Sequence, residues 1–186
     1  MIISKISARQ ILDSRGHPAV ECCLETKNFC VTSSCPSGAS KSGKELREIR
    51  DGLAAYSGMG VLKAISNLRK IGKKIAGKKM SQEDLDCFLY ENRSLGGNTI
   101  LPISMAFAKL DALENGRPLW KHLAKKVKTK PRMPQAFFNL INGGKHAGIS
   151  GIQEHMIVCR GSFREQIRAA SEIYHALGKR IKKKYG

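Results

Sequence analysis

The residues best suited to chemistry lie within residues 134–158, in the stretch PQAFFNLINGGKHAGISGIQEHMIV. Its glycine-rich loop presents Lys145 and His146, a cation and an imidazole, on a backbone that can bend tightly or move. Gln153 and Glu154 then place an amide beside a carboxylate on a predicted strand. Neighbouring side chains on a strand point to opposite faces, so one of this pair faces a given site while the other is fixed elsewhere.

Several ordered motifs in the chain resemble enolase, the glycolytic phosphopyruvate hydratase. The family pattern Asn-Gly-Gly, a variable residue, His-Ala-Gly and then Gln-Glu is matched across residues 142–154. Further matches lie at ARQILDSRG in residues 8–16 and at PSGAS in residues 36–40, with a weaker one at SEIYH in residues 171–175. Because the matches keep their order over nearly the whole chain, the resemblance is specific.

The resemblance implies dehydration of 2-phosphoglycerate to phosphoenolpyruvate and the reverse reaction, with Mg²⁺ stabilising the negative charge that develops. It implies that Ser40, at the end of the first lid, ligates a second Mg²⁺. A hydroxyl group is a hard oxygen donor and suits that role. It makes His146 the lid histidine that closes on substrate. Gln153 would bind the substrate, and Glu154 would assist departure of its hydroxyl group as part of an acid.

Without the family, the same residues have plainer interpretations. Ser40 would lie in a flexible turn, the loop histidine would be an ordinary surface histidine, and the glutamine–glutamate pair would be an exposed pair at a strand end. The resemblance also implies that Arg9 and Glu21 form salt links across a homodimer. Taken alone, each is a solvated charge.

The elements that must position the candidate site are predicted from its flanking residues. The apolar run 135–141 is bounded by a proline and by Asn-Gly-Gly, which indicates a strand buried on both faces. A second strand is predicted over residues 151–159. Ser162 and Glu165 form a capping-box signature for a final helix. The apolar face of that helix would consist of Ile167, Ala170, Ile173, Leu177 and Ile181.

The first part of the chain predicts strands followed by helices. Residues 2–12 favour a strand, and Val20, Cys22 and Leu24 alternate with polar residues in a second strand that has one buried face. A third short strand follows a turn at Asn28, and the short connections predict antiparallel pairing. Residues 33–43 are rich in Ser and Gly and lack periodicity, which predicts a mobile loop.

Three helices are predicted after this loop. Apolar residues recur at three- and four-residue spacing over residues 61–75, with lysines on the outside. Ser81 and Asp84 give a start signal for the next helix. The third helix is predicted over residues 99–114, where Pro102 is acceptable because it falls in the first turn.

The segment from Lys125 to Pro134 is basic, contains prolines and is the best candidate for a domain boundary. We therefore expect an α+β N-terminal domain over residues 1–133, with an antiparallel sheet followed by helices. Residues 134–186 are expected to form the truncated start of an α/β, TIM-like barrel. The resemblance places the principal Mg²⁺ ligands and the catalytic lysine outside these 186 residues. The chain alone is therefore expected to be an inactive fragment or truncated product, unless a second chain completes it.

The formal net charge of +18 leaves a second function open. Lysines and arginines cluster in residues 68–79, 121–132 and 178–184. Such clusters can bind RNA or another anionic partner, so a non-catalytic, basic RNA- or protein-binding module is the alternative to an enzyme. The same clusters are interleaved with apolar residues at helical spacing, which is typical of solvated helix faces.

The remaining composition predicts a cytoplasmic chain with no membrane association. The first residues lack the apolar core of a signal peptide, and no run approaches the length of a membrane span. The six cysteines have neither CxxC spacing nor the density of a secreted disulfide scaffold. We therefore expect them to be reduced packing residues.

Overall fold

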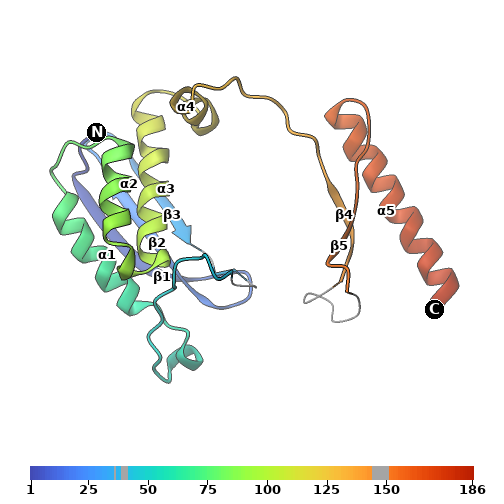
Figure 1. Ribbon diagram of the computed structural model, residues 1–186, viewed down its shortest axis with the longest axis horizontal. Helices are drawn as coiled ribbons and strands as arrows, with labels where there is room; N and C mark the ends of the chain where they lie inside the picture. Colours follow the sequence, from blue (N-terminus) through green and yellow to red (C-terminus); the bar gives the residue numbers. More distant parts are fainter. Residues whose placement is uncertain (36, 39–41, 144–150) are drawn as a thin grey trace. The chain divides into compact units, whose positions relative to one another are not determined.

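The computed structural model describes residues 1–35, 37–38, 42–143 and 151–186 (Figure 1). The chain divides into two compact units, Met1–Pro131 and Arg132–Gly186, called here the first and the second unit. Among the described residues, none of the helices combines the length and the apolar character that a bilayer crossing requires.

The first unit begins with a three-stranded antiparallel sheet in the order β1-β2-β3. Its strands are β1 (Lys5–Leu12), β2 (Pro18–Glu25) and β3 (Cys30–Cys35). On β2 the side chains of Val20, Cys22 and Leu24 are fully buried, so the predicted alternation is confirmed. The side chains between them are less buried and form the outer face of the sheet.

The third strand is longer than the sequence indicated. Ser33, Ser34 and Cys35 were predicted to begin a mobile loop, but they pair with β2, for example through Ser33 opposite Cys22. That part of the prediction is wrong because backbone pairing with a neighbouring strand does not require the apolar side chains on which the pattern depends.

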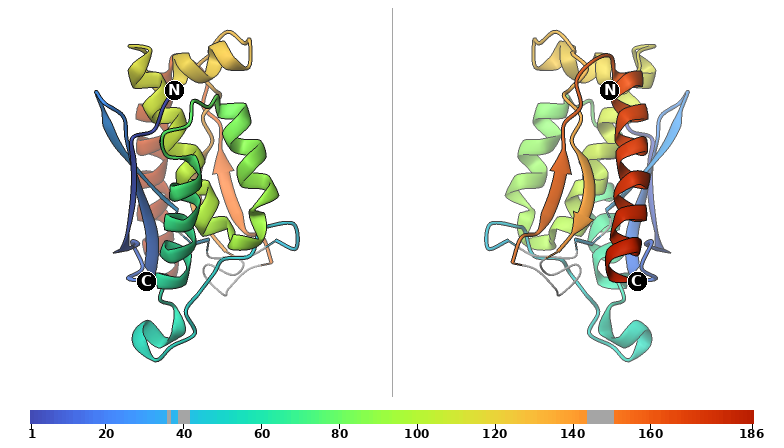
Figure 2. Two further views of the ribbon diagram at one scale, coloured as in Figure 1. Left: turned by 90° about the vertical axis from the view of Figure 1, so that its left-hand side faces the viewer. Right: turned by 90° about the vertical axis from the view of Figure 1, so that its right-hand side faces the viewer.

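Helices cover the inner face of this sheet, as Figures 1 and 2 show. The long helix α3 packs on β2 and β3, while α1 packs on β1 and on α3. The core includes Leu68 and Ile71 of α1 and Phe107 and Leu110 of α3, all with almost no exposed surface. The four α-helices of this unit are α1 (Leu62–Ile75), α2 (Gln82–Glu91), α3 (Gly97–Glu114) and α4 (Leu119–Lys126).

Two of the predicted helix starts are confirmed and one expectation is corrected. Ser81 accepts a hydrogen bond from the Asp84 backbone and the Asp84 carboxylate accepts one from the Ser81 backbone, which is the predicted capping box of α2. Ser162 and Glu165 do the same for α5 (Phe163–Tyr185) in the second unit. Helix α3 begins two residues earlier than expected, so Pro102 lies inside the helix in its second turn.

In its described residues, the second unit has a hairpin and one long helix. Strand β4 (Phe138–Asn142) pairs antiparallel with β5 (Glu154–Ile157), and the register shifts between Asn139 and Ile141. Within residues 132–143 and 151–186, these elements do not close into a barrel. They correspond to the expected short start of a barrel domain.

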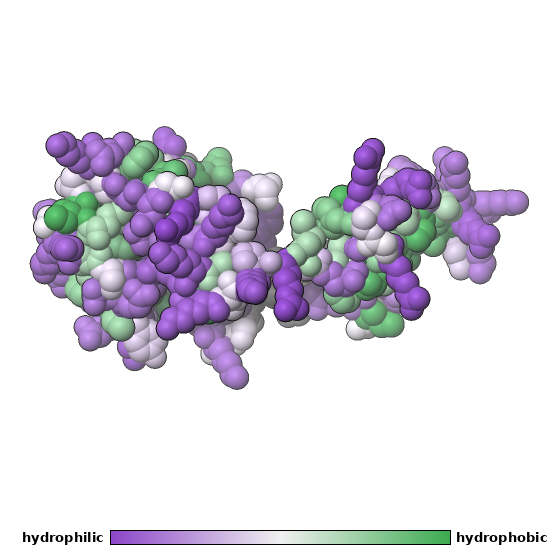
Figure 3. Space-filling model, turned by 90° about the horizontal axis from the view of Figure 1, so that it is seen from above, coloured by the Kyte–Doolittle hydropathy of each residue, from purple (hydrophilic) through white to green (hydrophobic). Residues whose placement is uncertain are grey.

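The strand predicted to be buried on both faces is largely exposed. Asn139 and Ile141 of β4 are exposed, and the preceding Phe137 is 66% exposed. On α5 the predicted apolar face buries Ala170 but leaves Ile173 42% exposed. Apolar side chains accordingly appear among hydrophilic ones on the unit at the right of Figure 3. An apolar run becomes a buried strand only where other elements cover both of its faces.

Candidate functional site

The predicted glutamine–glutamate pair lies at one end of the β4–β5 hairpin. Glu154 is the first residue of β5 and stands opposite Asn142, the last residue of β4. The backbone N–H of Gly143 donates a hydrogen bond of 2.8 Å to the carbonyl oxygen of Gln153. This pairing brings the Asn-Gly motif and the Gln-Glu motif together, although nine residues lie between Gly143 and Gln153 in the sequence.

The two side chains of the pair differ in their surroundings. Gln153 was predicted to stand on the strand, but β5 begins at Glu154, so Gln153 precedes it and is exposed. Glu154 is half-buried. On the opposite strand, the side-chain amide of Asn139 donates a 2.5 Å hydrogen bond to Oδ1 of Asn142, which fixes the orientation of the Asn142 amide. The hairpin end therefore presents one partly desolvated carboxylate beside fixed amide groups.

Two predicted site residues, Ser40 and His146, lie outside the described residues. Ser37, three residues before Ser40, is described, and both its carbonyl oxygen and its hydroxyl group form hydrogen bonds. The Arg15 guanidinium donates a hydrogen bond to the Ser37 carbonyl oxygen. The Ser37 hydroxyl donates to Oε2 of Glu48 over 3.0 Å. These contacts anchor Ser37 to the folded part of the first unit.

Glu48 and Arg50 complete this anchor, and sequence reasoning missed both. Their side chains are 17% and 16% exposed and form an ion pair with an N–O distance of 2.9 Å. Arg50 also donates hydrogen bonds to the carbonyl oxygens of Pro18 (2.6 Å) and Met59 (2.7 Å). A largely desolvated, multiply bonded guanidinium holds its geometry better than an exposed pair. Residues 42–60 show no helical or strand periodicity, so no local pattern indicated this role.

A cavity of about 410 Å³ lies beside the anchored segment. Gly38, Ser42 and Glu45 line it on one side, and Asn98 of α3 contributes to another side. Burial raises the pKa of the Cys35 thiol, which also lines the cavity, and the negative charge of Glu48 acts in the same direction. The first unit thus has a hollow with a largely apolar lining, which includes Leu46 and Leu101, next to Gly38 of the predicted lid segment.

The described residues do not by themselves provide a Mg²⁺ site. Mg²⁺ requires near-octahedral oxygen coordination, whereas Glu48 already binds Arg50 and Ser37. Across the described part of the chain, one group of three close titratable ligands is found, and it contains two thiols: Cys23, Glu25 and Cys30. Sulfur ligands are unsuited to Mg²⁺.

Arg9 and Glu21 face each other across β1 and β2 of the same chain. Arg9 Nε donates to Glu21 Oε1 over 2.5 Å, and the Arg9 side chain remains 72% exposed. The pair lies on the outer face of the sheet, where a second copy could reach the arginine. The salt link across a homodimer stays a prediction.

The basic clusters lie mainly on exposed helix faces. Lys70, Lys73 and Lys74 of α1 are exposed, as are Lys182 and Lys183 of α5. This arrangement agrees with the interpretation as solvated faces. RNA binding stays an untested prediction.

Comparison with known proteins relates both units to one set of relatives. The family model described as "Enolase, N-terminal domain" matches residues 3–123, and "Enolase, C-terminal TIM barrel domain" matches residues 129–186. An enolase from Methanothrix thermoacetophila is 45% identical over 195 residues, which cover 99% of this chain and 46% of that relative. The chain thus spans about half the length of the curated relative that it matches.

Proposed function

The chain belongs to the enolase family. We propose that it forms part of a phosphopyruvate hydratase, a lyase that interconverts 2-phosphoglycerate and phosphoenolpyruvate plus water. The observation that carries the proposal is the pairing of Asn142 with Glu154, which joins the two family motifs at one hairpin end. The identity to an archaeal enolase over nearly the whole chain supports it.

In this proposal Glu154 is the catalytic carboxyl group of the hairpin. Dehydration removes the proton from the carbon next to the carboxylate and expels the hydroxyl group from the adjacent carbon. Glu154, as part of an acid group, assists that departure so that water is the leaving species. Its half-buried position supports the role, because a partly desolvated carboxyl group interacts more strongly with a substrate than a fully solvated one. Gln153 and His146 are proposed to bind the substrate.

Mg²⁺ is the proposed cofactor, with the Ser40 hydroxyl as one oxygen ligand. When bound, the ion would act as a Lewis acid that stabilises the negative charge of the intermediate. The hydrogen bonds at Ser37 support this proposal, because functional groups next to a residue held by several contacts are positioned more accurately. Membership of the family also supports the proposal that the protein forms a homodimer through Arg9 and Glu21. A cytoplasmic location is proposed on the same ground.

A chimeric enzyme tests the proposal directly. Residues 1–186 of this chain would replace the matching part of the Methanothrix enolase, and formation of phosphoenolpyruvate would be followed by its ultraviolet absorbance with and without Mg²⁺. We expect Mg²⁺-dependent turnover from the chimera. We expect no turnover from the 186-residue chain alone. A folded chimera without activity would overturn the proposal.

Glu154→Gln in the chimera tests the assigned catalytic group. Removing an acid–base group lowers a rate by roughly 10²–10⁴-fold, so we expect kcat to fall by at least about 100-fold. The matched control is Glu172→Gln on the exposed face of α5, where the carboxylate forms only a 3.7 Å pair with Arg168. Equal rates for the two variants would exclude Glu154 from the reaction.

A further inference from the structure

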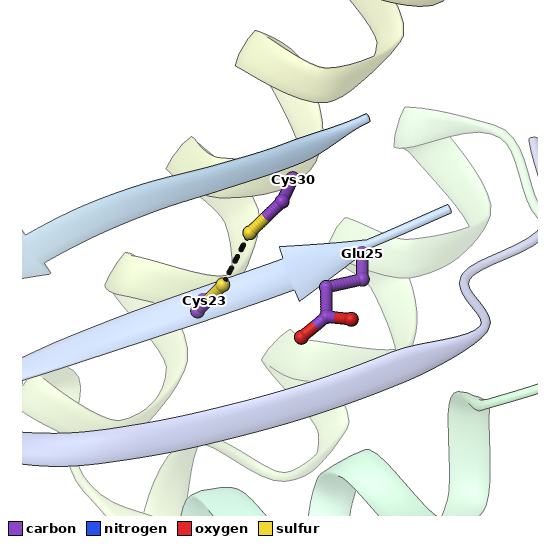
Figure 4. Close-up of side chains that lie close together, drawn as sticks. All are labelled: Cys23, Glu25 and Cys30. Carbon is purple, nitrogen blue, oxygen red and sulfur yellow. Dashed lines mark hydrogen bonds between the residues drawn. The ribbon is translucent and has the colours of Figure 1, made fainter. Parts of the chain in front are cut away.

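The outer face of the sheet in the first unit carries two thiols in contact with each other. Cys23 lies on β2 and Cys30 is the first residue of β3, and their Sγ atoms are 2.8 Å apart. Glu25, the last residue of β2, stands opposite Cys30 in the strand register. One ligand atom from each of the three residues lies within 4.8 Å of the others. Figure 4 shows the three side chains gathered at this end of the sheet.

This cluster differs from what the cysteine pattern predicted. Cys30 is exposed and Cys23 is only partly buried, so the expectation of interior packing is wrong for Cys30. The residues come from two strands joined by the turn at residues 26–29, and the strand pairing sets their positions. A sheet is a rigid support for such a group, unlike a surface loop.

The chemistry of the cluster suits a thiophilic cation. Two sulfur donors and one carboxylate oxygen are a ligand set used by Zn²⁺, with Zn–S distances of about 2.3 Å. Ligands at that distance from a tetrahedral ion lie about 3.8 Å apart, so the sulfurs would have to separate by about 1 Å. Because Cys30 is exposed, rotation of its side chain can provide that shift without a change in the core.

Two neighbouring features would oppose the ion: an exposed ion pair at Glu25 and a proton held on Cys23. Lys5 Nζ forms a 3.1 Å ion pair with one oxygen of Glu25, but the lysine side chain is 66% exposed. Such surface pairs contribute little free energy, so the cation can displace it at small cost. Burial raises the pKa of the Cys23 thiol to about 11, with the neighbouring Cys30 adding to the effect. A cation must therefore displace a proton there, and binding should weaken as the pH falls.

We propose that Cys23, Cys30 and Glu25 form a binding site for a thiophilic divalent cation of the Zn²⁺ class, with the fourth position open to water or another ligand. The site is independent of the proposed lyase reaction and of its Mg²⁺. With three protein ligands on an exposed face, the bound ion exchanges with solution.

Titration of the reduced 186-residue chain with Zn²⁺, and with Cd²⁺ as a spectroscopic probe, tests the site. A non-thiol reductant keeps the cysteines reduced. We expect one equivalent to bind, a Cd²⁺–thiolate absorption band in the ultraviolet, and release of protons measured in buffers of different ionisation enthalpy.

Single substitutions identify the ligands. Cys23→Ser and Cys30→Ser should each weaken binding by at least tenfold and reduce the thiolate band, while Glu25→Gln should weaken binding and keep the band. The matched control is Cys87→Ser, which removes an exposed cysteine on α2 outside the cluster. Circular dichroism melts of all variants would show that each is folded.

Two results would overturn the proposal. The first is binding of Zn²⁺ with the same affinity after Cys23→Ser and Cys30→Ser as after Cys87→Ser. The second is that the reduced chain binds no cation, while mass spectrometry shows that the two thiols only form a Cys23–Cys30 disulfide when the chain is exposed to air. Neither result would bear on the chimera assay, whose variants lie in the second unit.

Discussion

The two units of the chain bury their apolar side chains to very different extents. In the first unit, Phe107 and Leu68 have no exposed surface, because sheet and helices enclose them together. In the second unit, Ile167 and Ile173 are 47% and 42% exposed, although they follow the same amphipathic spacing. The difference shows that an apolar helix face becomes a core only when another layer packs against it.

The largest expected contrast is between a buried apolar side chain of the first unit and an exposed one of the second unit. Phe107→Ala should cost about 3–5 kcal/mol, since it removes a fully buried ring and leaves a cavity. Ile173→Ala should cost less than about 0.5 kcal/mol, as for an exposed position. Hydrogen exchange read by mass spectrometry, unit by unit in rising urea, measures both. A cost for Ile173→Ala as large as that for Phe107→Ala would mean that the face of α5 is covered in solution.

Removing the Asp51 carboxylate, which caps helix α1 from a distant position in the sequence, should destabilise the protein less than Phe107→Ala does. Val61 precedes the helix and cannot cap it with an apolar side chain. Instead, the buried Asp51 carboxylate accepts hydrogen bonds from the backbone N–H groups of Leu62 (2.9 Å) and Lys63 (2.8 Å). Asp51→Ala leaves these donors without that acceptor and should cost about 2–3 kcal/mol in urea unfolding.

The matched variant for this cap is Asp51→Asn. It keeps the size of the side chain and one acceptor oxygen, so it should lose about half as much stability as Asp51→Ala. Equal costs for the two variants would assign the effect to the negative charge at the helix start instead of the hydrogen bonds.

The capping serines should give a smaller effect than Asp51→Ala, and a similar one in both units. Ser81→Ala at α2 and Ser162→Ala at α5 should each cost about 1 kcal/mol of local helix stability. Hydrogen exchange of the first turn of each helix measures it. If removing one cap lowered the helix stability several times more than removing the other, that cap would be coupled to the packing of its unit.

The capping boxes also predict a pH dependence. Hydrogen bonds from the Ser81 backbone and hydroxyl lower the pKa of Asp84, and those from the Ser162 hydroxyl and backbone lower the pKa of Glu165. A carboxyl group with a lowered pKa contributes stability that is present above its ordinary pKa and is lost as the pH falls through the folded value. The protection factors of the first helical turns, which compare exchange with that of an unfolded chain at the same pH, should therefore fall in acid more in the wild type than in Ser81→Ala or Ser162→Ala.

The parts of the fold that the sequence predicted are those encoded by local patterns. The spacing of Ile65, Leu68 and Ile71 predicted both the position of α1 and its buried face. The capping boxes likewise depend on residues three apart, so their starts were found. Pro102 and residues 33–35 were misjudged, because tertiary contacts extended α3 and β3 beyond what local preference indicates.

The candidate site divides in the same way. The family motif identified Glu154, and the strand register then placed it opposite Asn142. The Cys23–Cys30 contact, and the hydrogen bonds that Glu48 and Arg50 make with Ser37, Pro18 and Met59, join segments whose spacing carries no recognisable signal. Such contacts depend on which strands and loops become neighbours in the fold. They cannot be predicted from local sequence patterns alone.

Asn98 illustrates how a single side chain can define where a loop tolerates change. Its amide accepts a hydrogen bond from the Ile49 backbone N–H and donates one to the Ile49 carbonyl oxygen, both 3.0 Å long. One residue of α3 thus clamps residues 42–60 at their middle. Extra residues inserted within the exposed stretches 43–46 or 53–57 would leave the clamp intact. An insertion beside Ile49 would remove both hydrogen bonds at once, so protein engineers should treat the segment as two separate loops.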